Sequence, residues 1–272
     1  MAVITFLTDF GSSDSYVAEM KGTALCLCPA ATLIDITHSI PHADILRGAQ
    51  VLAAAATTFP DRTVHIGVVD PGVGSNRRRI LLEAEYETST KTRLRAYFVG
   101  PDNGLFSLAV ARARLVKAWH IRNMSLLAGT PAPTTFDGRD VFTPVGAQVA
   151  AGAKPDGLGT PVDYEQLVRL DLPLPIKGAD DSLEGEIVYI DHFGNAVTNI
   201  PADAVPVDAG LLLLGANAEQ LPRVVNYEQI EAGRCAVLIN SMRRLEIAAH
   251  RSSAALLLNL QVGQLVRVQA RK

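Results

Sequence analysis

Short apolar runs rich in β-branched residues alternate with longer amphipathic segments through the first 150 residues of the chain. The runs are typical of buried strands, and the segments between them have the length and spacing of helices. A chain that alternates in this way favours a parallel sheet with right-handed crossovers. We therefore predict strands at 3–8, 32–36, 64–69, 80–84 and 94–99, and helices at 14–28, 43–58, 104–113 and 141–151.

The pattern changes after residues 171–181, which contain Pro and Gly and which we interpret as a linker. Short strand-like runs follow with few helical candidates between them, a pattern typical of a small antiparallel barrel or sandwich. These runs lie at 186–190, 211–214, 236–239, 245–249 and 265–269. The predicted fold class is α/β, with a doubly wound, mainly parallel N-terminal domain at 1–170 and a smaller C-terminal antiparallel β-barrel domain at 182–272.

Composition narrows the functional classes. The formal net charge of −3 over 272 residues gives no basic footprint for nucleic acid or an anionic membrane, so we expect neither as a partner. The first nine residues lack a basic segment and reach Asp9 too early for a signal peptide, which predicts a cytoplasmic protein. Cys26, Cys28 and Cys235 lack the spacing of a zinc site, and we expect buried thiols and no metal.

The segment with the most chemical information runs from Val68 through Asp70-Pro71-Gly72 to Arg77-Arg78-Arg79. An apolar strand delivers one carboxylate onto a tight turn, and three guanidinium groups follow. Side chains at the carboxyl ends of parallel strands face the crevice in which ligands bind, although a solvated turn would also fit this segment. Further motifs occur at 8–11, 100–106, 136–140, 191–199 and 240–241.

These motifs, in this order, resemble those of the S-adenosyl-L-methionine (SAM) hydroxide adenosyltransferases, which are related to enzymes that make 5′-fluoro- and 5′-chloro-adenosine. The resemblance covers nearly the whole chain, from Ile4 to about Val268. It implies that water attacks C5′ of the ribose and yields adenosine and L-methionine, with SAM as a small-molecule substrate and with no cofactor. It also implies a homotrimer in which each active site lies between the first domain of one subunit and the barrel of its neighbour.

The resemblance implies three catalytic residues: Asp70, Arg77 and Asp137. The first two match the start of an Asp-Arg-His set that holds the attacking water, whereas Asp137 stands at the position of the histidine. An ionised aspartate only accepts hydrogen bonds, so it cannot take over the role of a histidine unchanged. We expect Asp137 to pair with Arg77 or Arg139, or one of two neighbouring carboxylates to take up a proton. Weakened activity is a further alternative.

The resemblance also implies substrate contacts. Asp9 would bind the ribose hydroxyls. Phe193 and Asn195 would contact the adenine, and Asp191 and Ser241 would hold the amino and carboxylate ends of the methionine. We further predict Asp14 and Arg251 as substrate-binding residues.

Three other functions compete with SAM hydrolysis. A halogenase of the same fold would need a pocket without carboxylates, and the charge of Asp70 disfavours halide. A non-catalytic protein that binds SAM or adenosine is the second alternative. A metal-dependent hydrolase that uses Asp9, Asp70, Asp102 and Asp137 is the third, although we interpret Asp102-Asn103 as part of a turn.

Overall fold

The computed structural model describes residues 2–87, 92–122, 135–170, 172–178, 182–205, 209–213 and 220–270. The chain divides into two compact units, Met1–Leu170 and Asp171–Lys272. Within the described ranges, no helix has the length and apolarity that crossing a bilayer requires.

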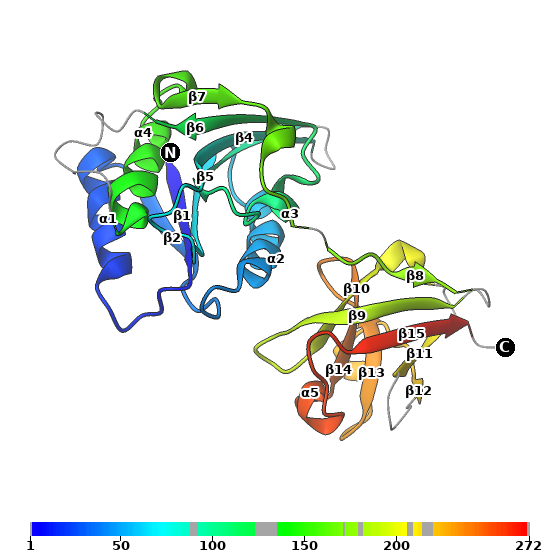
Figure 1. Cartoon of the computed structure of the whole chain (residues 1–272). Helices are drawn as coiled ribbons and strands as arrows, with labels where there is room; N and C mark the ends of the chain where they lie inside the picture. Colours follow the sequence, from blue (N-terminus) through cyan, green and yellow to red (C-terminus); the bar gives the residue numbers. More distant parts are fainter. Residues whose placement is uncertain are drawn as a thin grey trace. The chain divides into compact units, whose positions relative to one another are not determined.

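A seven-stranded sheet in the order β2-β1-β3-β5-β4-β6-β7 forms the centre of the first unit (Figure 1). The strands β2, β1, β3 and β5 run parallel, and β4, β6 and β7 continue the sheet in antiparallel pairs. The prediction of a mainly parallel sheet is therefore confirmed, but the sequence analysis missed β6 and β7. The strands are β1 (Val3–Thr8), β2 (Thr32–Thr37), β3 (Thr63–Val68), β4 (Arg79–Glu87), β5 (Arg93–Pro101), β6 (Leu115–Ile121) and β7 (Gly159–Val162).

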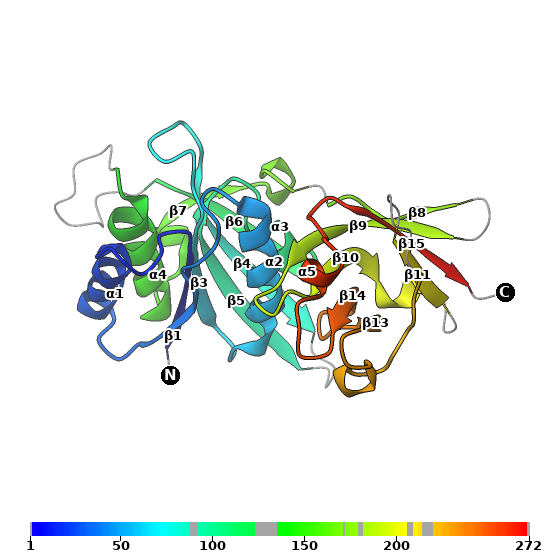
Figure 2. The same ribbon diagram turned by 90° about the horizontal axis from the view of Figure 1, so that it is seen from below.

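Helices cover both faces of this sheet (Figures 1 and 2). On β1, Ile4 and Phe6 pack into a core with α1 (Tyr16–Leu27) and α4 (Thr143–Ala150), whereas Leu7 belongs to the core that includes residues of α2 (Ile45–Ala55) and α3 (Ser107–Val110). Successive side chains of a strand point to opposite faces, so the continuous apolar run of β1 reflects burial on both sides. The doubly wound arrangement follows from this pattern.

Two predicted helices differ from the observed ones. The helix expected at 104–113 is the single turn α3, because the preceding residues form a turn in which Asn103 Oδ1 accepts a hydrogen bond from Leu105 N at 3.2 Å. The helix expected at 141–151 is α4, preceded by a π-helical turn, Gly138–Phe142.

The connection between β3 and β4 crosses the carboxyl end of β5, because β5 lies between these two strands in the sheet. It is the light-blue loop that projects beyond the strand ends in Figure 2. Asp70 and Arg77 lie on this connection, and Arg79 is the first residue of β4. The topology thus brings one carboxylate and several guanidinium groups to the end of the sheet at which ligands bind in α/β folds.

The second unit is an antiparallel sheet in the order β12-β11-β15-β9-β10-β14-β13, with β8 paired to β9. An isolated bridge from Arg223 to Val237 joins the residues after β12 to β13, but no closed sheet is present in the described residues, so the predicted barrel is not confirmed. The segment 171–181, which was predicted to be a linker, contains the short strand β8. Residues 171 and 179–181 of this segment are not among the described residues. Residue 214, the last of the strand predicted at 211–214, is not among them either. The strands are β8 (Ile176–Lys177), β9 (Leu183–Ile190), β10 (Ala196–Pro201), β11 (Ala209–Leu213), β12 (Gln220–Leu221), β13 (Cys235–Ile239), β14 (Arg244–Ala249) and β15 (Leu265–Ala270), with a short helix α5 (Ala254–Leu257).

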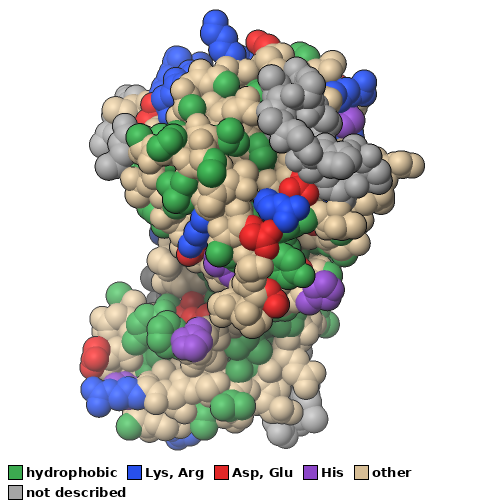
Figure 3. Space-filling view, turned by 90° about the vertical axis from the view of Figure 1, so that its left-hand side faces the viewer, with side chains coloured by type: hydrophobic (Ala, Val, Ile, Leu, Met, Phe, Trp, Pro, Cys, Tyr) green, Lys and Arg blue, Asp and Glu red, His purple; other side chains and the backbone are tan. Residues whose placement is uncertain are grey.

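Acidic and basic side chains are interspersed on the face drawn in Figure 3. This distribution agrees with the small net charge of the chain.

Candidate functional site

A pocket of about 420 Å³ opens at the carboxyl ends of β1 and β3 in the first unit. The order of the strands explains its position, because β1 and β3 are parallel neighbours and each is followed by an aspartate. Three carboxylates, one histidine and three aromatic side chains line it: Asp9, Asp70, Asp137, His42, Phe10, Tyr16 and Phe136.

Arg77 joins the two carboxylates Asp70 and Asp137. Its Nε donates to Asp70 Oδ1 at 2.7 Å, and its Nη2 donates both to Asp70 Oδ2 and, at 2.6 Å, to Asp137 Oδ2. The structure therefore brings the three predicted catalytic residues together, although they come from the loop after β3 and from a segment about 60 residues further along the chain.

Arg79 is a second partner of Asp137, and the sequence analysis missed it. Its Nε donates to Asp137 Oδ2 at 2.8 Å and its Nη2 to Asp137 Oδ1 at 3.0 Å, the forked geometry that guanidinium and carboxylate groups favour. The expectation that Asp137 pairs with Arg77 or Arg139 is confirmed for Arg77. The Arg139 side chain instead donates to Asp140 Oδ1 at 2.6 Å and to Glu19 Oε2 at 2.7 Å.

This network is almost entirely buried. The side chains of Asp70, Asp137 and Arg77 are 4%, 1% and 9% exposed. Burial alone would lower the pKa of Arg77, but its hydrogen bonds to Asp70 and Asp137 outweigh burial and raise it. The guanidinium thus remains charged between the two carboxylates, and it also lies over the ring of Phe142, with 5.5 Å from Cζ to the ring centroid.

Asp9 lies across the same pocket at the end of β1. Its Oδ2 accepts a hydrogen bond from Ala43 N at 3.0 Å and is 3.4 Å from His42 Nδ1. Its side chain is 7% exposed. A carboxylate has about four acceptor positions, so this one can still accept hydroxyl hydrogens from a ligand.

Three aromatic rings form one wall of the pocket. Phe10, Tyr16 and Phe136 pack edge to face or tilted, with ring centroids 5.2–5.8 Å apart. Arg139 Cζ lies 5.2 Å from the Phe136 centroid and so supports the outer ring. The wall offers an apolar surface to the nonpolar part of a ligand.

Asp14 differs from its prediction in one respect. The helix predicted to begin at Asp14 is α1, whose N-cap is Ser15; this serine makes no capping bond to the backbone and donates instead to Glu19 Oε1 at 2.6 Å. Asp14 is exposed and is not among the residues that line the pocket. Its predicted substrate contact stays a prediction.

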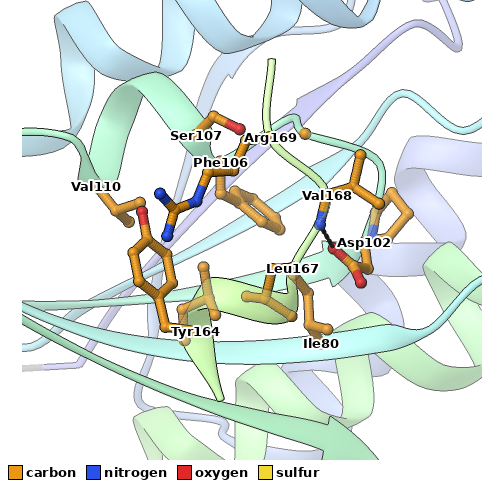
Figure 4. Close-up of a pocket in the computed structure, with 12 residues that line it drawn as sticks. Ile80, Asp102, Phe106, Ser107, Val110, Tyr164, Leu167, Val168 and Arg169 are labelled. Carbon is orange, nitrogen blue, oxygen red and sulfur yellow. Dashed lines mark hydrogen bonds between the residues drawn. The ribbon is translucent and has the colours of Figure 1, made fainter. Parts of the chain in front are cut away.

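Asp102 serves the fold rather than the pocket. Its two oxygens accept hydrogen bonds from Arg78 Nε at 2.6 Å and from Val168 N at 2.9 Å, which ties β5 to the segment after β7 (Figure 4). Asp102 lines a separate, much smaller cavity of about 10 Å³. Within the described part of the chain, no three His, Cys, Asp or Glu side chains are grouped as metal ligands would be.

The second unit contains the loop 191–195, which is held together by hydrogen bonds to the Asp191 side chain. Asp191 Oδ1 accepts hydrogen bonds from the backbone N–H groups of Phe193 and Asn195, both at 2.9 Å, and Oδ2 accepts one from Asn195 Nδ2 at 3.0 Å. Asn195 is buried, whereas Phe193 is 74% exposed. Three of the predicted binding residues thus form one rigid loop.

A second loop of this unit carries Ser241. Asn240 Oδ1 accepts hydrogen bonds from the N–H groups of Met242 at 3.0 Å and Arg244 at 3.1 Å, and Asn240 Nδ2 donates to the buried Glu246. Burial raises the pKa of Glu246, against the opposing hydrogen bonds from Asn240 and Tyr227. Ser241 is exposed at the tip of this loop.

Arg251 is exposed and adopts φ 51°, directly after β14 and the bridging residue 250. The three elements of the second unit that were predicted to bind substrate all lie outside its strands: the 191–195 loop, Ser241 and Arg251. The contacts of these residues within the second unit do not test their predicted roles in substrate binding.

Comparison with known proteins shows similarity over almost the whole chain. Residues 4–159 match the SAM hydroxide adenosyltransferase N-terminal domain, and residues 185–267 match the C-terminal domain of the same family. A protein from Thermus thermophilus named (R)-S-adenosyl-L-methionine hydrolase is 35% identical over 98% of this chain and 100% of its own length. A protein of the same name from Salinispora tropica is 36% identical over 98% and 97% of the two chains, and a fluorinase from an Actinoplanes species is 28% identical over 98% and 97%.

Solved structures show the same likeness. A crystal structure of an uncharacterized conserved protein from Thermotoga maritima has a TM-score of 0.86 and 29% identity, and covers 98% of this chain and 100% of its own. A conserved hypothetical protein from Thermus thermophilus has a TM-score of 0.76 and 34% identity over 99% and 100% of the two chains.

Proposed function

Because the chain belongs to the SAM hydroxide adenosyltransferase family, we propose that it hydrolyses S-adenosyl-L-methionine to adenosine and L-methionine. The hydrolase relatives carry a name that specifies the (R) form of this substrate, and we extend this preference to the present chain. The sequence analysis made no prediction about which epimer of SAM is used. The observation that carries the proposal is the pair of carboxylates, Asp70 and Asp137, held by one guanidinium at the edge of a pocket.

The reaction needs little chemical assistance. The oxygen of water forms a bond to C5′ while the bond from C5′ to sulfur breaks, and its electron pair stays on sulfur as the neutral thioether of methionine. The water gives up one proton, so the products are adenosine, methionine and a proton. A sulfonium is already an activated leaving group, and the protein must chiefly place the water in line and exclude other nucleophiles.

The contacts distinguish the two carboxylates. Among the described residues, Asp137 accepts hydrogen bonds from two guanidinium groups, Arg77 and Arg79, whereas both oxygens of Asp70 accept from Arg77. A carboxylate has about four acceptor positions, so Asp70 retains capacity for a water molecule. Asp70 is therefore the group that orients the water and takes its proton, and Asp137 holds Arg77 in place.

The opposite side of the pocket suits the nucleoside. Asp9 would accept hydrogen bonds from the ribose hydroxyls, and the wall of Phe10, Tyr16 and Phe136 would exclude bulk water from the reacting carbon. The pocket volume of about 420 Å³ lies within the range of small-molecule sites.

The second unit supplies the remaining contacts in this proposal. Phe193 would stack on the adenine and Asn195 would hydrogen-bond its edge, while Asp191, Ser241 and Arg251 would contact the rest of the substrate. We propose a homotrimer in which the first domain, 1–170, meets the barrel domain, 182–272, of a neighbouring subunit. A substrate contact by Asp14 and a cytoplasmic location of the protein also remain predictions.

A halogenating activity fits the pocket less well. The Asp70 carboxylate lines the pocket and offers hydrogen-bond acceptors to the position of the attacking water, where they would receive a water hydrogen but repel a halide. The alternative of a binding protein without catalysis predicts bound SAM and no product.

The test is incubation of the purified protein with each sulfonium epimer of SAM in water enriched in ¹⁸O, followed by chromatography and mass spectrometry. We expect adenosine that carries ¹⁸O at its 5′ hydroxyl, released faster from the (R) epimer. Retained SAM without product would support the binding protein, 5′-chloroadenosine formed in chloride buffer would support the halogenase, and unlabelled adenosine would exclude attack by water at C5′.

A further inference from the structure

The contact between Arg79 and Asp137 has no role in the proposed function as stated. Arg79 lies at the first position of β4, with a side chain 23% exposed, and reaches a carboxylate that is 1% exposed. A forked, charge-assisted contact with such a carboxylate is stronger than an ordinary surface ion pair. The contact between Arg79 and Asp137 is therefore a structural element of this edge of the pocket.

Charge balance indicates what the contact does. Asp70 and Asp137 carry two negative charges and share Arg77, whose Nη2 donates to both. With Arg77 alone, the buried cluster would carry an uncompensated negative charge, which is costly in a site of low polarity. Arg79 brings the cluster to neutrality.

Geometry indicates the same role. Arg79 occupies both oxygens of Asp137, at 2.8 and 3.0 Å, and Arg77 takes only one of them. Asp137 is thus held by Arg79 and presents a fixed acceptor to Arg77. Arg77 in turn fixes the orientation of Asp70 through its Nε and Nη2 groups.

We propose that Arg79 and Asp137 act as one unit that positions Arg77 against the water-orienting Asp70. This inference rests on the proposed function. Arg79 is a positioning residue, since it does not line the pocket and acts through Asp137. The unit stands at the position where the family resemblance implies a histidine, and Arg79 balances the charge that a lone Asp137 would bring there.

Several titratable or charged groups surround Arg79 and Asp137, and each of them could contribute to the pH dependence of kcat. Asp70 and Arg77 face it from the loop after β3, and Asp9 and His42 line the same pocket from the other side. Arg139 is engaged by Glu19 and Asp140, and His120 of β6 lies beside β4, where burial and the charges of Arg78 and Arg79 lower its pKa. A cation beside a carboxylate favours its ionised form, so removal of Arg79 is expected to shift the acidic limb of the kcat profile to higher pH.

The first test compares Arg79→Gln, Arg79→Lys and the control Arg78→Gln by adenosine release over a range of pH. Arg79→Gln is expected to lower kcat by about 10- to 100-fold with KM nearly unchanged, as misplaced catalytic groups do, and to move the acidic limb of the kcat profile upward by about one pH unit. Arg79→Lys keeps the charge, so the limb is expected to stay in place. Arg78→Gln removes a charge from the same loop but contacts Asp102 and Gln166 rather than Asp137, so neither effect is expected.

The second test is a double-mutant cycle of Arg79→Gln and Asp137→Asn. Each single change leaves an unbalanced charge, whereas the double variant retains the neutral pair of Asp70 and Arg77. We expect the double variant to have a higher kcat than either single variant. This comparison also covers the case in which Arg79→Gln alone folds poorly.

Three results would overturn the inference. They are an unmoved acidic limb in Arg79→Gln, an equal shift in Arg78→Gln, and a double variant whose loss of kcat is the product of the two single losses. In each case the wild type still releases adenosine, so the proposed function stands. A wild type that releases no adenosine refutes the proposed function itself.

Discussion

Replacement of Gly194 by alanine tests whether the loop that carries Phe193 and Asn195 has only one permitted backbone. Gly194 has φ 84°, a conformation that costs a residue with a side chain about 1–2 kcal/mol. An added Cβ would overlap Ser253 Oγ and lie 2.5 Å from Ser253 Cβ. Such overpacking costs about 1–3 kcal/mol, so we expect the free energy of unfolding to fall by about 2–5 kcal/mol.

Gly233→Ala is a matched control for this change. Gly233 lies in the same unit and has φ 72°, but an added Cβ would meet no atom within 4 Å. It is expected to lose only the conformational part, about 1–2 kcal/mol. The second mutation of the pair Gly194→Ala/Ser253→Gly removes Ser253 Oγ and Cβ, but it leaves Cα 2.9 Å from the new Cβ and removes the cap bond from Leu256 N to Ser253 Oγ, so it should recover only part of the steric loss.

Urea unfolding of the three variants measures these differences, and the KM for SAM measures their effect on binding. A displaced 191–195 loop should raise KM more than it lowers kcat, because Phe193 and Asn195 are proposed to contact the adenine. Equal stability losses in Gly194→Ala and Gly233→Ala would refute the steric argument. An unchanged KM in a destabilised Gly194→Ala would refute the proposed role of the loop.

Three further predictions concern the first unit. Asp70→Asn should lower kcat by about 10²- to 10⁴-fold with a smaller effect on SAM binding, and an unchanged kcat with a raised KM would show that Asp70 only positions substrate. Asp137→His should lower adenosine release, because it removes the carboxylate that Arg77 and Arg79 share; a faster variant would contradict the assigned network. Burial lowers the pKa of His65 to about 4, against an opposing backbone hydrogen bond, so the unfolded chain takes up its proton first as the pH falls. Stability from this residue should therefore be complete above about pH 6.5 and decline toward pH 4 by up to about 3 kcal/mol, and urea unfolding of His65→Gln should lack this decline.

The strands of the first unit were predictable where burial is continuous. All six residues of β1 and of β3 are buried, and each appears in the sequence as an apolar run. By contrast, β6 includes Lys117 and His120, and β7 has four residues, among them Pro161. Neither carries a periodic signal, and both depend on pairing with strands already in the sheet. In the second unit β10 was missed because its polar residues, Thr198 and Asn199, are buried through specific hydrogen bonds.

The site was predictable where it follows from strand ends. Asp9 and Asp70 lie directly after parallel neighbouring strands, so their proximity follows from topology. The partners of Asp137 were not predictable in the same way. Arg139 is the nearer arginine in sequence, but it belongs to a π-helical turn and contacts Asp140 and Glu19. Arg79 lies 58 positions away, and no local pattern links it to Asp137.

The connection from β3 to β4 also bears on how such enzymes diverge. Asp70, Arg77 and Arg79 all belong to this one stretch of ten positions, and Asp137, which Arg77 and Arg79 share, directly precedes the single turn before α4. Inheritance of a different connection together with a change at residue 137 would exchange the whole charged side of the pocket, while every strand of the sheet kept its neighbours. Under the proposed function, the nucleophile that the pocket accepts would depend on one short segment and one distant residue. A change of nucleophile would then leave the seven-stranded sheet as it is.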